Sequence, residues 1–304
     1  MNGLRITCPR KTWRRATAGF TLVEVIVVMV VAGVLAATLT VFLRPAIDGY
    51  IDSRERAGLQ AEAEITLATM VREVRRAVPN SIRSPGNQCF ELLPASGGGR
   101  YRSGPDTVND SGAACTPGAN CSAWVDTGTL TTTFDVLSAS GTPAAVGDSI
   151  VINNQNGNDV YEGLNRSRIT AVETPAAPYG VVRLTIEPLQ VSPGYDGARY
   201  SVVPQDQQAV FYGCVDADGT LDAQGNGRGR LLRLSGYGYD ATAPSSCPTA
   251  GGVMVASGVR SCNFVHDPNQ GATQQSGFVW IELQIARHGE TAHLGMGAHV
   301  PNAP

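Results

Sequence analysis

The chain has 304 residues, of which 42% are hydrophobic and only 16% are charged, and it contains 35 Gly and 18 Pro. This balance excludes a disordered chain and is typical of exported, β-rich domains with many turns. Five of the 23 basic residues and none of the 26 acidic ones precede Phe20, so the remainder has a formal charge of −8, which disfavours nucleic-acid binding.

The first segment, residues 1–19, is basic, and the positive-inside rule predicts that it stays in the cytoplasm. Residues 20–43 (FTLVEVIVVMVVAGVLAATLTVFL) contain a single charge, Glu24. As a helix this segment would be about 36 Å long, enough for a hydrocarbon core of about 30 Å. We therefore expect one membrane pass, with the N-terminus cytoplasmic and the rest of the chain on the other side.

Three interpretations of this segment compete: a plain membrane anchor, a signal peptide cut near residues 32–37, and a leader cut before the apolar run. Glu24 distinguishes them. A carboxylate at the bilayer centre costs about 2.5–3.5 kcal/mol on insertion scales, so an ionisable residue there is by default functional. An anchor or a signal peptide gains nothing from it.

The residues Gly19-Phe20-Thr21-Leu22-Val23-Glu24, behind a basic leader, resemble the type IV prepilin family. The resemblance implies that a prepilin peptidase cuts between Gly19 and Phe20 and methylates the new amine of Phe20. It also implies that Glu24, the fifth residue of the mature chain, acts in assembly. Pairing with the Phe20 amine of a neighbouring subunit would offset the cost of its charge.

Residues 44–79 read as an amphipathic continuation of the same helix, with Leu67, Met70 or Val71, Val74 and Val78 at helical spacing. Pro45 should kink the helix rather than end it, and Pro79 should stop it. We therefore predict one helix over about residues 20–78. A basic face is formed by Arg72, Arg75 and Arg76; it could dock an acidic partner or a DNA backbone, but a solvated face near Glu73 is favoured.

Residues 80–304 change to short β-rich runs separated by turns. No second amphipathic helix is evident, so we expect a mainly antiparallel sheet and, from the resemblance, an α+β fold of the type IV pilin kind. The spacer 96–99, with its three glycines, is interpreted as a hairpin loop. The predicted strands are 131–137, 148–153, 180–188, 200–212, 230–234 and 278–287.

Six of the seven cysteines follow the leader, an even number that suits a disulfide-bonded exported head. Cys115 and Cys121 can form a local disulfide, and Cys89, Cys214, Cys247 and Cys262 can pair in three ways. Their spacing does not match a zinc site, and the carboxylates within 216–222 are interpreted as a turn rather than a calcium loop. No metal or other cofactor is expected.

Further patches resemble minor pilins of mannose-sensitive haemagglutinin (MSHA) pili: 48–54, 70–83, 89–94, 100–102 and 299–302. This resemblance implies a minor subunit that primes or caps filament assembly. Its partners would be other major and minor pilins, an inner-membrane assembly platform and a cytoplasmic ATPase. The chain would lie first in the bacterial inner membrane, with its head in the periplasm, and then in the pilus at the cell surface.

Three other functions are weighed against this one. A J-class pseudopilin of type II secretion is the nearest rival. A tip adhesin would use loops such as 103–128 and 235–277. A tethered enzyme is disfavoured, because the sequence lacks a recognisable set of nucleophile, base and orienting residue.

Overall fold

The computed structural model describes residues 19–301, except residues 113–114, 119, 195–196 and 271–275. Residues 1–18, where the leader is expected, lie outside the described residues. The chain divides into two compact units, residues 1–54 and residues 55–304. One helix, α1 (Leu22–Arg75), contributes to both units, and the strands all belong to the second.

The long helix α1 is continuous through Pro45, so this proline does not end it. The helix was expected to reach residue 78 but ends at Arg75. Beyond that point Ala77 forms an isolated bridge with Pro94, and the Val78 N–H donates to Leu93 O at 2.8 Å. These contacts draw the chain away from helical geometry before Pro79 is reached.

A seven-stranded sheet forms the first part of the head, in the order β1-β2-β9-β10-β11-β12-β13. Every neighbouring pair in it is antiparallel, which confirms the expected sheet type. The strands are β1 (Arg83–Gly86), β2 (Cys89–Leu92), β9 (Val210–Val215), β10 (Gly229–Ser235), β11 (Val253–Gln270), β12 (Ser276–Arg287) and β13 (Glu290–Pro301).

The second half of α1 packs on one face of this sheet. Its buried residues recur every three or four positions: Leu59, Ala63, Leu67, Met70 and Val74. This spacing places them on one side of a helix. They join the inward-facing strand residues in one core, in which aromatic rings from three strands meet, Phe90, Tyr212 and Phe264.

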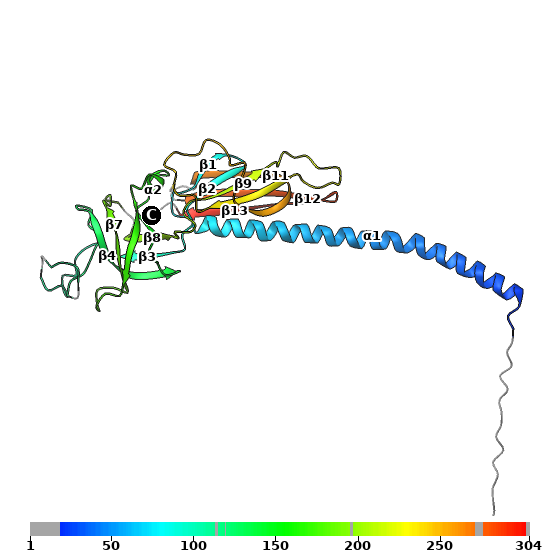
Figure 1. Ribbon diagram of the computed structural model, residues 1–304, viewed down its shortest axis with the longest axis horizontal. Helices are drawn as coiled ribbons and strands as arrows, with labels where there is room; N and C mark the ends of the chain where they lie inside the picture. The colour runs from blue at the N-terminus through cyan, green and yellow to red at the C-terminus, as the bar shows by residue number, and fades with distance from the viewer. Residues whose placement is uncertain (1–18, 113–114, 119, 195–196, 271–275, 302–304) are drawn as a thin grey trace, which may run out of the picture. The chain divides into compact units, whose positions relative to one another are not determined.

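A second part of the head is a closed antiparallel barrel, which Figure 1 shows in green beside the sheet. It has its own core, with Phe134 at the centre of a ring cluster. All of its strands come from residues 97–203, between β2 and β9, which are neighbours in the sheet. In barrel order the strands are β3 (Gly97–Tyr101), β4 (Thr131–Gly141), β7 (Val182–Leu189), β6 (Arg166–Glu173), β5 (Ser149–Ile152) and β8 (Arg199–Val203).

Two sequence interpretations were wrong in this region. The glycine spacer 96–99 is not a hairpin loop, because Gly97–Gly99 lie within β3. A Cβ atom at Gly99 would collide with the backbone oxygen of Ser138 on β4, so the tight barrel requires glycine there. The predicted strand 200–212 is two strands, β8 and β9, because a turn beginning at Pro204 separates them.

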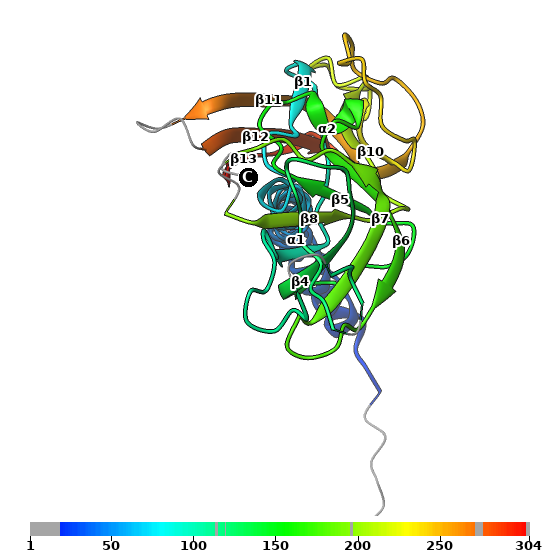
Figure 2. The ribbon, with the colours of Figure 1, turned by 90° about the vertical axis from the view of Figure 1, so that its left-hand side faces the viewer.

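A third apolar cluster joins sheet and barrel. It is built around Tyr161 on the short helix α2 (Asp159–Glu162) and includes Val78 and Leu93. The Tyr161 hydroxyl donates to Ser81 O at 2.7 Å, so a buried polar atom is satisfied at the junction. Figure 2 shows α2 between strands of the sheet and strands of the barrel.

Candidate functional site

The expected cleavage point lies immediately before the first turn of α1. Gly19 and Phe20 precede the helix and are exposed. Thr21 caps the helix, because the Glu24 N–H lies 3.3 Å from Thr21 Oγ1 and 3.1 Å from Thr21 O. Thr-x-x-Glu is the pattern of a capping box. Glu24 therefore has a local role in starting α1, where a carboxylate gains about 0.3–1 kcal/mol from the helix dipole.

The fold of the described residues does not explain why residue 19 is a glycine. A Cβ atom added to Gly19 would meet no heavy atom within 4 Å. A requirement for glycine at this position would therefore have to come from another molecule that approaches the backbone closely.

The apolar half of α1 is not buried by any part of the chain that the structure describes. Among its large hydrophobic side chains the least exposed is Val25, which is 42% exposed, and no residue from Gly19 to Arg54 is buried. Among the described residues α1 is the one helix long and apolar enough to cross a membrane. An apolar surface of this extent needs lipid or neighbouring helices to cover it.

The basic face of α1 differs from the expectation in one respect. Glu73 does not balance Arg72, Arg75 and Arg76, because its carboxylate lies 3.1 Å from Arg233 Nη2 on β10 and accepts a 3.0 Å hydrogen bond from the Tyr212 hydroxyl. The three arginines of the face are exposed. In the described part of the chain they form no ion pair.

A buried ion pair ties β1 to β2. Arg83 Nη2 lies 2.5 Å from Glu91 Oε2, and the two side chains are only 8% and 3% exposed. The Tyr237 hydroxyl donates to the other Glu91 oxygen at 2.7 Å, and Arg83 lies 3.4 Å above the Tyr161 ring. Burial and the Glu91 charge both raise the pKa of Tyr237. This cluster connects strand, short helix and loop, and leaves no carboxylate oxygen unpaired.

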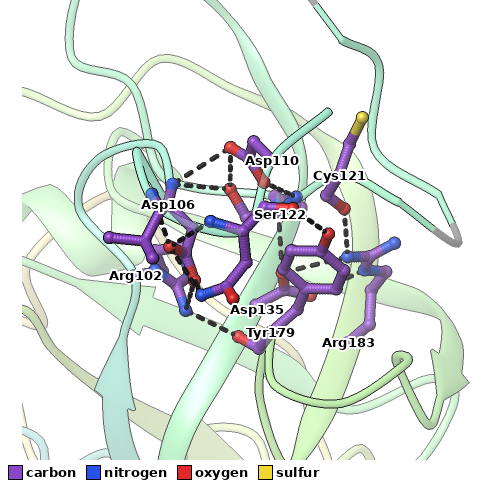
Figure 3. Close-up of polar contacts among 11 residues, drawn as sticks. Arg102, Asp106, Asp110, Cys121, Ser122, Asp135, Tyr179 and Arg183 are labelled. Atoms are coloured by element: carbon purple, nitrogen blue, oxygen red, sulfur yellow. Dashed lines mark hydrogen bonds and ion pairs between the residues drawn. The ribbon is translucent and has the colours of Figure 1, made fainter. Parts of the chain in front are cut away.

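A second buried pair anchors the long loop between β3 and β4. Arg183 Nε lies 2.6 Å from Asp135 Oδ1, and Arg183 Nη2 donates to Cys121 O at 2.9 Å. Asp135 also accepts the Ala123 N–H at 2.8 Å, so both its oxygens are used. Figure 3 shows Arg183 bridging the strand and the loop.

The same loop is held by further carboxylates. Asp110 accepts from Ser122 N at 2.7 Å, from Ser122 Oγ at 2.8 Å and from Asp106 N at 3.0 Å. Hydrogen bonding to Asn109 is the main cause that lowers the pKa of Asp106. Figure 3 shows both carboxylates turned toward the loop itself. The hydrogen bonds of these two carboxylates hold the backbone of the loop in place, so the carboxylates do not form a pair available for acid–base chemistry.

The structure joins the six head cysteines in three disulfides. Cys115 and Cys121 form the local bond that their spacing allows. Of the three possible pairings of the other four, the structure has Cys89–Cys247 and Cys214–Cys262. The first ties β2 to the loop that follows β10, and the second ties β9 to β11, the two neighbours of β10.

The carboxylates of residues 216–222 and two histidines of the head also have local partners. Asp218 and Asp222 accept backbone N–H groups two residues ahead, as turn residues do. His288 and His293 each lie beside a glutamate, Glu55 and Glu282. Among the described residues no group of three His, Cys, Asp or Glu side chains could hold a metal ion.

Comparison with known families identifies one segment. Residues 14–40 match the family described as the prokaryotic N-terminal methylation motif. Neither the curated proteins nor the solved structures contain a match to the chain. The motif indicates a protein of the type IV pilin or pseudopilin kind, which implies processing by a prepilin peptidase and assembly with other pilins. With the long apolar helix and the disulfide-bonded antiparallel head, the chain has an α+β fold of the type IV pilin kind.

Proposed function

We propose that this chain is a minor pilin of the MshO kind, incorporated into an MSHA-type pilus, where it primes or caps assembly at the tip. The observation that carries this proposal is the methylation motif at residues 14–40, which includes the start of an apolar helix whose first half is buried by none of the described residues. A filament subunit needs both features, whereas an enzyme tethered to a membrane needs the apolar helix but not the methylation motif. No catalytic role is assigned to the head.

Each segment has its own role in this proposal. Residues 1–19 are the leader removed on processing, residues 20–43 are first the membrane span and then the filament core, and residues 44–79 connect it to the head. Residues 80–304 are the head, first in the periplasm and later on the pilus. A head that contains a sheet and a barrel is bulky, which favours a subunit used in few copies at the tip over one repeated along the shaft.

The proposed chemistry at the N-terminus involves three residues. The peptidase cuts between Gly19 and Phe20 and methylates the freed amine of Phe20. In the filament the Glu24 carboxylate pairs with the Phe20 amine of a neighbouring subunit, which offsets the cost of a charge among apolar helices. The inner-membrane platform and its ATPase would supply the work of assembly.

The test is the N-terminal mass of the protein recovered from membranes and sheared filaments, from cells with and without prepilin peptidase. We expect an N-methylated Phe20 start that depends on the peptidase. A Gly19→Val chain should remain uncut, and because Gly19 has no steric role in the fold, its head should stay folded. A start near residue 36 would identify a signal peptide instead, and an intact Met1 a plain anchor.

The same cells distinguish the pilus from a type II secretion system with a J-class pseudopilin. Deleting the gene should reduce pili on the cell surface and leave exported enzymes at normal levels in the medium. Loss of secreted enzymes with normal pili would assign the chain to secretion instead.

A further inference from the structure

The outermost strand of the seven-stranded sheet, β13, has a free edge. It pairs with β12 on one side, and no strand of the described residues pairs with its other side. Figure 2 shows β11, β12 and β13 following one another in that order, with β13 last. A free strand edge presents unpaired N–H and C=O groups to any chain that can lie alongside.

The turn before β13 determines which of its backbone groups point outward. His288 and Gly289 form a two-residue connection with φ values of 50° and 85°, as in a type I′ hairpin turn. In such a hairpin the closing residues, Arg287 and Glu290, exchange both hydrogen bonds, and the pattern then alternates along the strand. The outward groups therefore belong to Thr291, His293, Gly295, Gly297 and His299.

The two edges of the sheet are protected very differently. The opposite edge, β1, has four residues, contains Pro85 and has an irregular register. Short edge strands, proline and bulges all discourage pairing with another chain. In contrast, β13 pairs with β12 over twelve residues without a register shift, and residues 291–300 contain no Lys, Arg, Asp, Glu or Pro.

The second half of α1 runs beside this edge. At one end Arg56 Nε lies 2.8 Å from Glu290 Oε2. Further along, a groove of about 470 Å³ is lined by β13 residues Met296 and Gly297 and by the basic face Arg72, Arg75 and Arg76. These arginines are exposed and have no carboxylate partner in the described part of the chain, because Glu73 is paired with Arg233. The groove thus combines a strand edge with unbalanced positive charge.

We propose that β13 accepts an added strand from another chain, an extended segment with carboxylates at every second position that bind Arg72, Arg75 and Arg76. The spacing fits. Arg72 and Arg76 are separated by about 6 Å along a helix, and alternate residues of a strand by about 6.8 Å. An added strand would lie about 4.8 Å from β13. The inference rests on the proposed function only for the source of that strand, a neighbouring filament subunit.

The experiment uses the purified full-length chain in detergent micelles and a labelled eight-residue peptide of alternating threonine and glutamate. Two control peptides are an alternating threonine–lysine peptide and one with the same threonines and glutamates in two blocks. We expect the alternating acidic peptide to bind about tenfold more tightly than either control, as two exposed ion pairs would provide. Hydrogen exchange should slow at residues 291, 293, 295, 297 and 299.

Variants separate the charge from the strand edge. The triple variant R72Q/R75Q/R76Q should lose about tenfold in affinity, whereas R168Q/R228Q/R230Q, with the same charge change on exposed arginines outside this groove, should bind normally. His299→Pro should weaken binding and His299→Ala should not, because proline removes an outward N–H that β12 does not use.

Three results would overturn the proposal: no binding, equal binding by the two triple variants, or protection outside β13. Because no step requires a leader peptidase or a filament, failure here leaves the proposed function standing. An unprocessed N-terminus in cells would likewise leave this result intact.

Discussion

Glu24 lies in the first turn of α1, where Thr21 caps the helix and the dipole favours a negative charge. That local role exists in any apolar helix that starts here. Pairing with a neighbour's Phe20 amine exists only in an assembly. The two roles therefore predict different losses when the charge alone is removed.

Glu24→Gln should leave insertion and cleavage intact and reduce entry into filaments at least about tenfold, which corresponds to about 1.4 kcal/mol. The measurement is the ratio of chain in sheared filaments to chain in membranes. Glu64→Gln, the same change at an exposed position of α1, is the control. Normal entry by Glu24→Gln would remove the amine-pairing argument, and loss of cleavage would move its role to the peptidase.

At Glu91 the charge is paired within the head. Glu91→Gln would leave the Arg83 guanidinium, 8% exposed, without its counter-charge. Breaking a buried pair in this way costs about 3–5 kcal/mol. We expect the free energy of unfolding to fall by that amount in urea titrations followed by tryptophan fluorescence. The exposed Glu187→Gln should change it by less than about 0.5 kcal/mol, and equal effects would show that the pair contributes little.

Tyr200 gives the head a dependence on alkaline pH. Burial raises the pKa of its phenol to about 12, above the ordinary value of about 10. The folded state therefore keeps the phenol proton up to a higher pH than the unfolded state does. The stabilisation from the buried neutral phenol is complete below a pH of about 10 and is lost as the pH rises toward about 12. The loss should be smaller in Tyr200→Phe, measured by urea titration at several pH values. An identical profile would contradict this.

Among the elements, the helix and the sheet type were predictable, and several strand boundaries were not. Apolar spacing in residues 59–78 predicts α1 because one face must meet a sheet. The strand β3 was missed because its three glycines look like a loop, and only the close approach of β4 explains them. The strands β11 and β13 were missed because their residues mix Gly, His and polar side chains, although both strands pair with β12, their neighbour in the sequence.

The candidate site was predictable only where its residues lie close together in the sequence. Gly19, Phe20 and Glu24 form a local pattern that a sequence displays directly. Arg83–Glu91 and Asp135–Arg183 depend on pairing across strands. The available signal was a carboxylate inside an apolar run, as in Phe90-Glu91-Leu92, since a buried charge needs a partner.

The three disulfides should differ in what they contribute to stability. In the chain-entropy account the contribution grows with the logarithm of the loop closed. The loops span 6, 48 and 158 residues for Cys115–Cys121, Cys214–Cys262 and Cys89–Cys247. The second bond should contribute about 2 kcal/mol more than the first, and the third about 1 kcal/mol more than the second.

Replacing each cysteine pair by alanines in turn tests this order, with Tm measured for each variant. We expect the smallest decrease without Cys115–Cys121 and the largest without Cys89–Cys247. The reverse order would show that contacts in the folded head, rather than loop closure, determine the effect.

For the whole molecule, the division of the head was not predictable from the sequence. Residues 97–203 form a barrel with its own core, inserted between two strands that are neighbours in the sheet. No composition change marks either boundary, and nothing local indicates that β2 and β9 pair across more than a hundred residues. The division between the apolar segment and the head, in contrast, is visible in the sequence, because hydrophobic and polar residues separate clearly along α1.

That second division predicts that the head folds without the apolar segment. The first buried residue of α1 is Leu59, and no residue from Gly19 to Arg54 is buried, so a chain of residues 55–304 loses no core contact. Made in an oxidising compartment, it should be soluble and monomeric by size-exclusion chromatography. Its Tm should lie within about 4 °C of the Tm of the full processed chain, since the truncation lowers the free energy of unfolding by less than about 1 kcal/mol.

The matched chain of residues 63–304, which also lacks Leu59, should be less stable by about 2–4 kcal/mol. An unfolded or aggregated product from residues 55–304 would mean that the apolar segment supports the head, and assembly would then have to be understood as a change in the head as well.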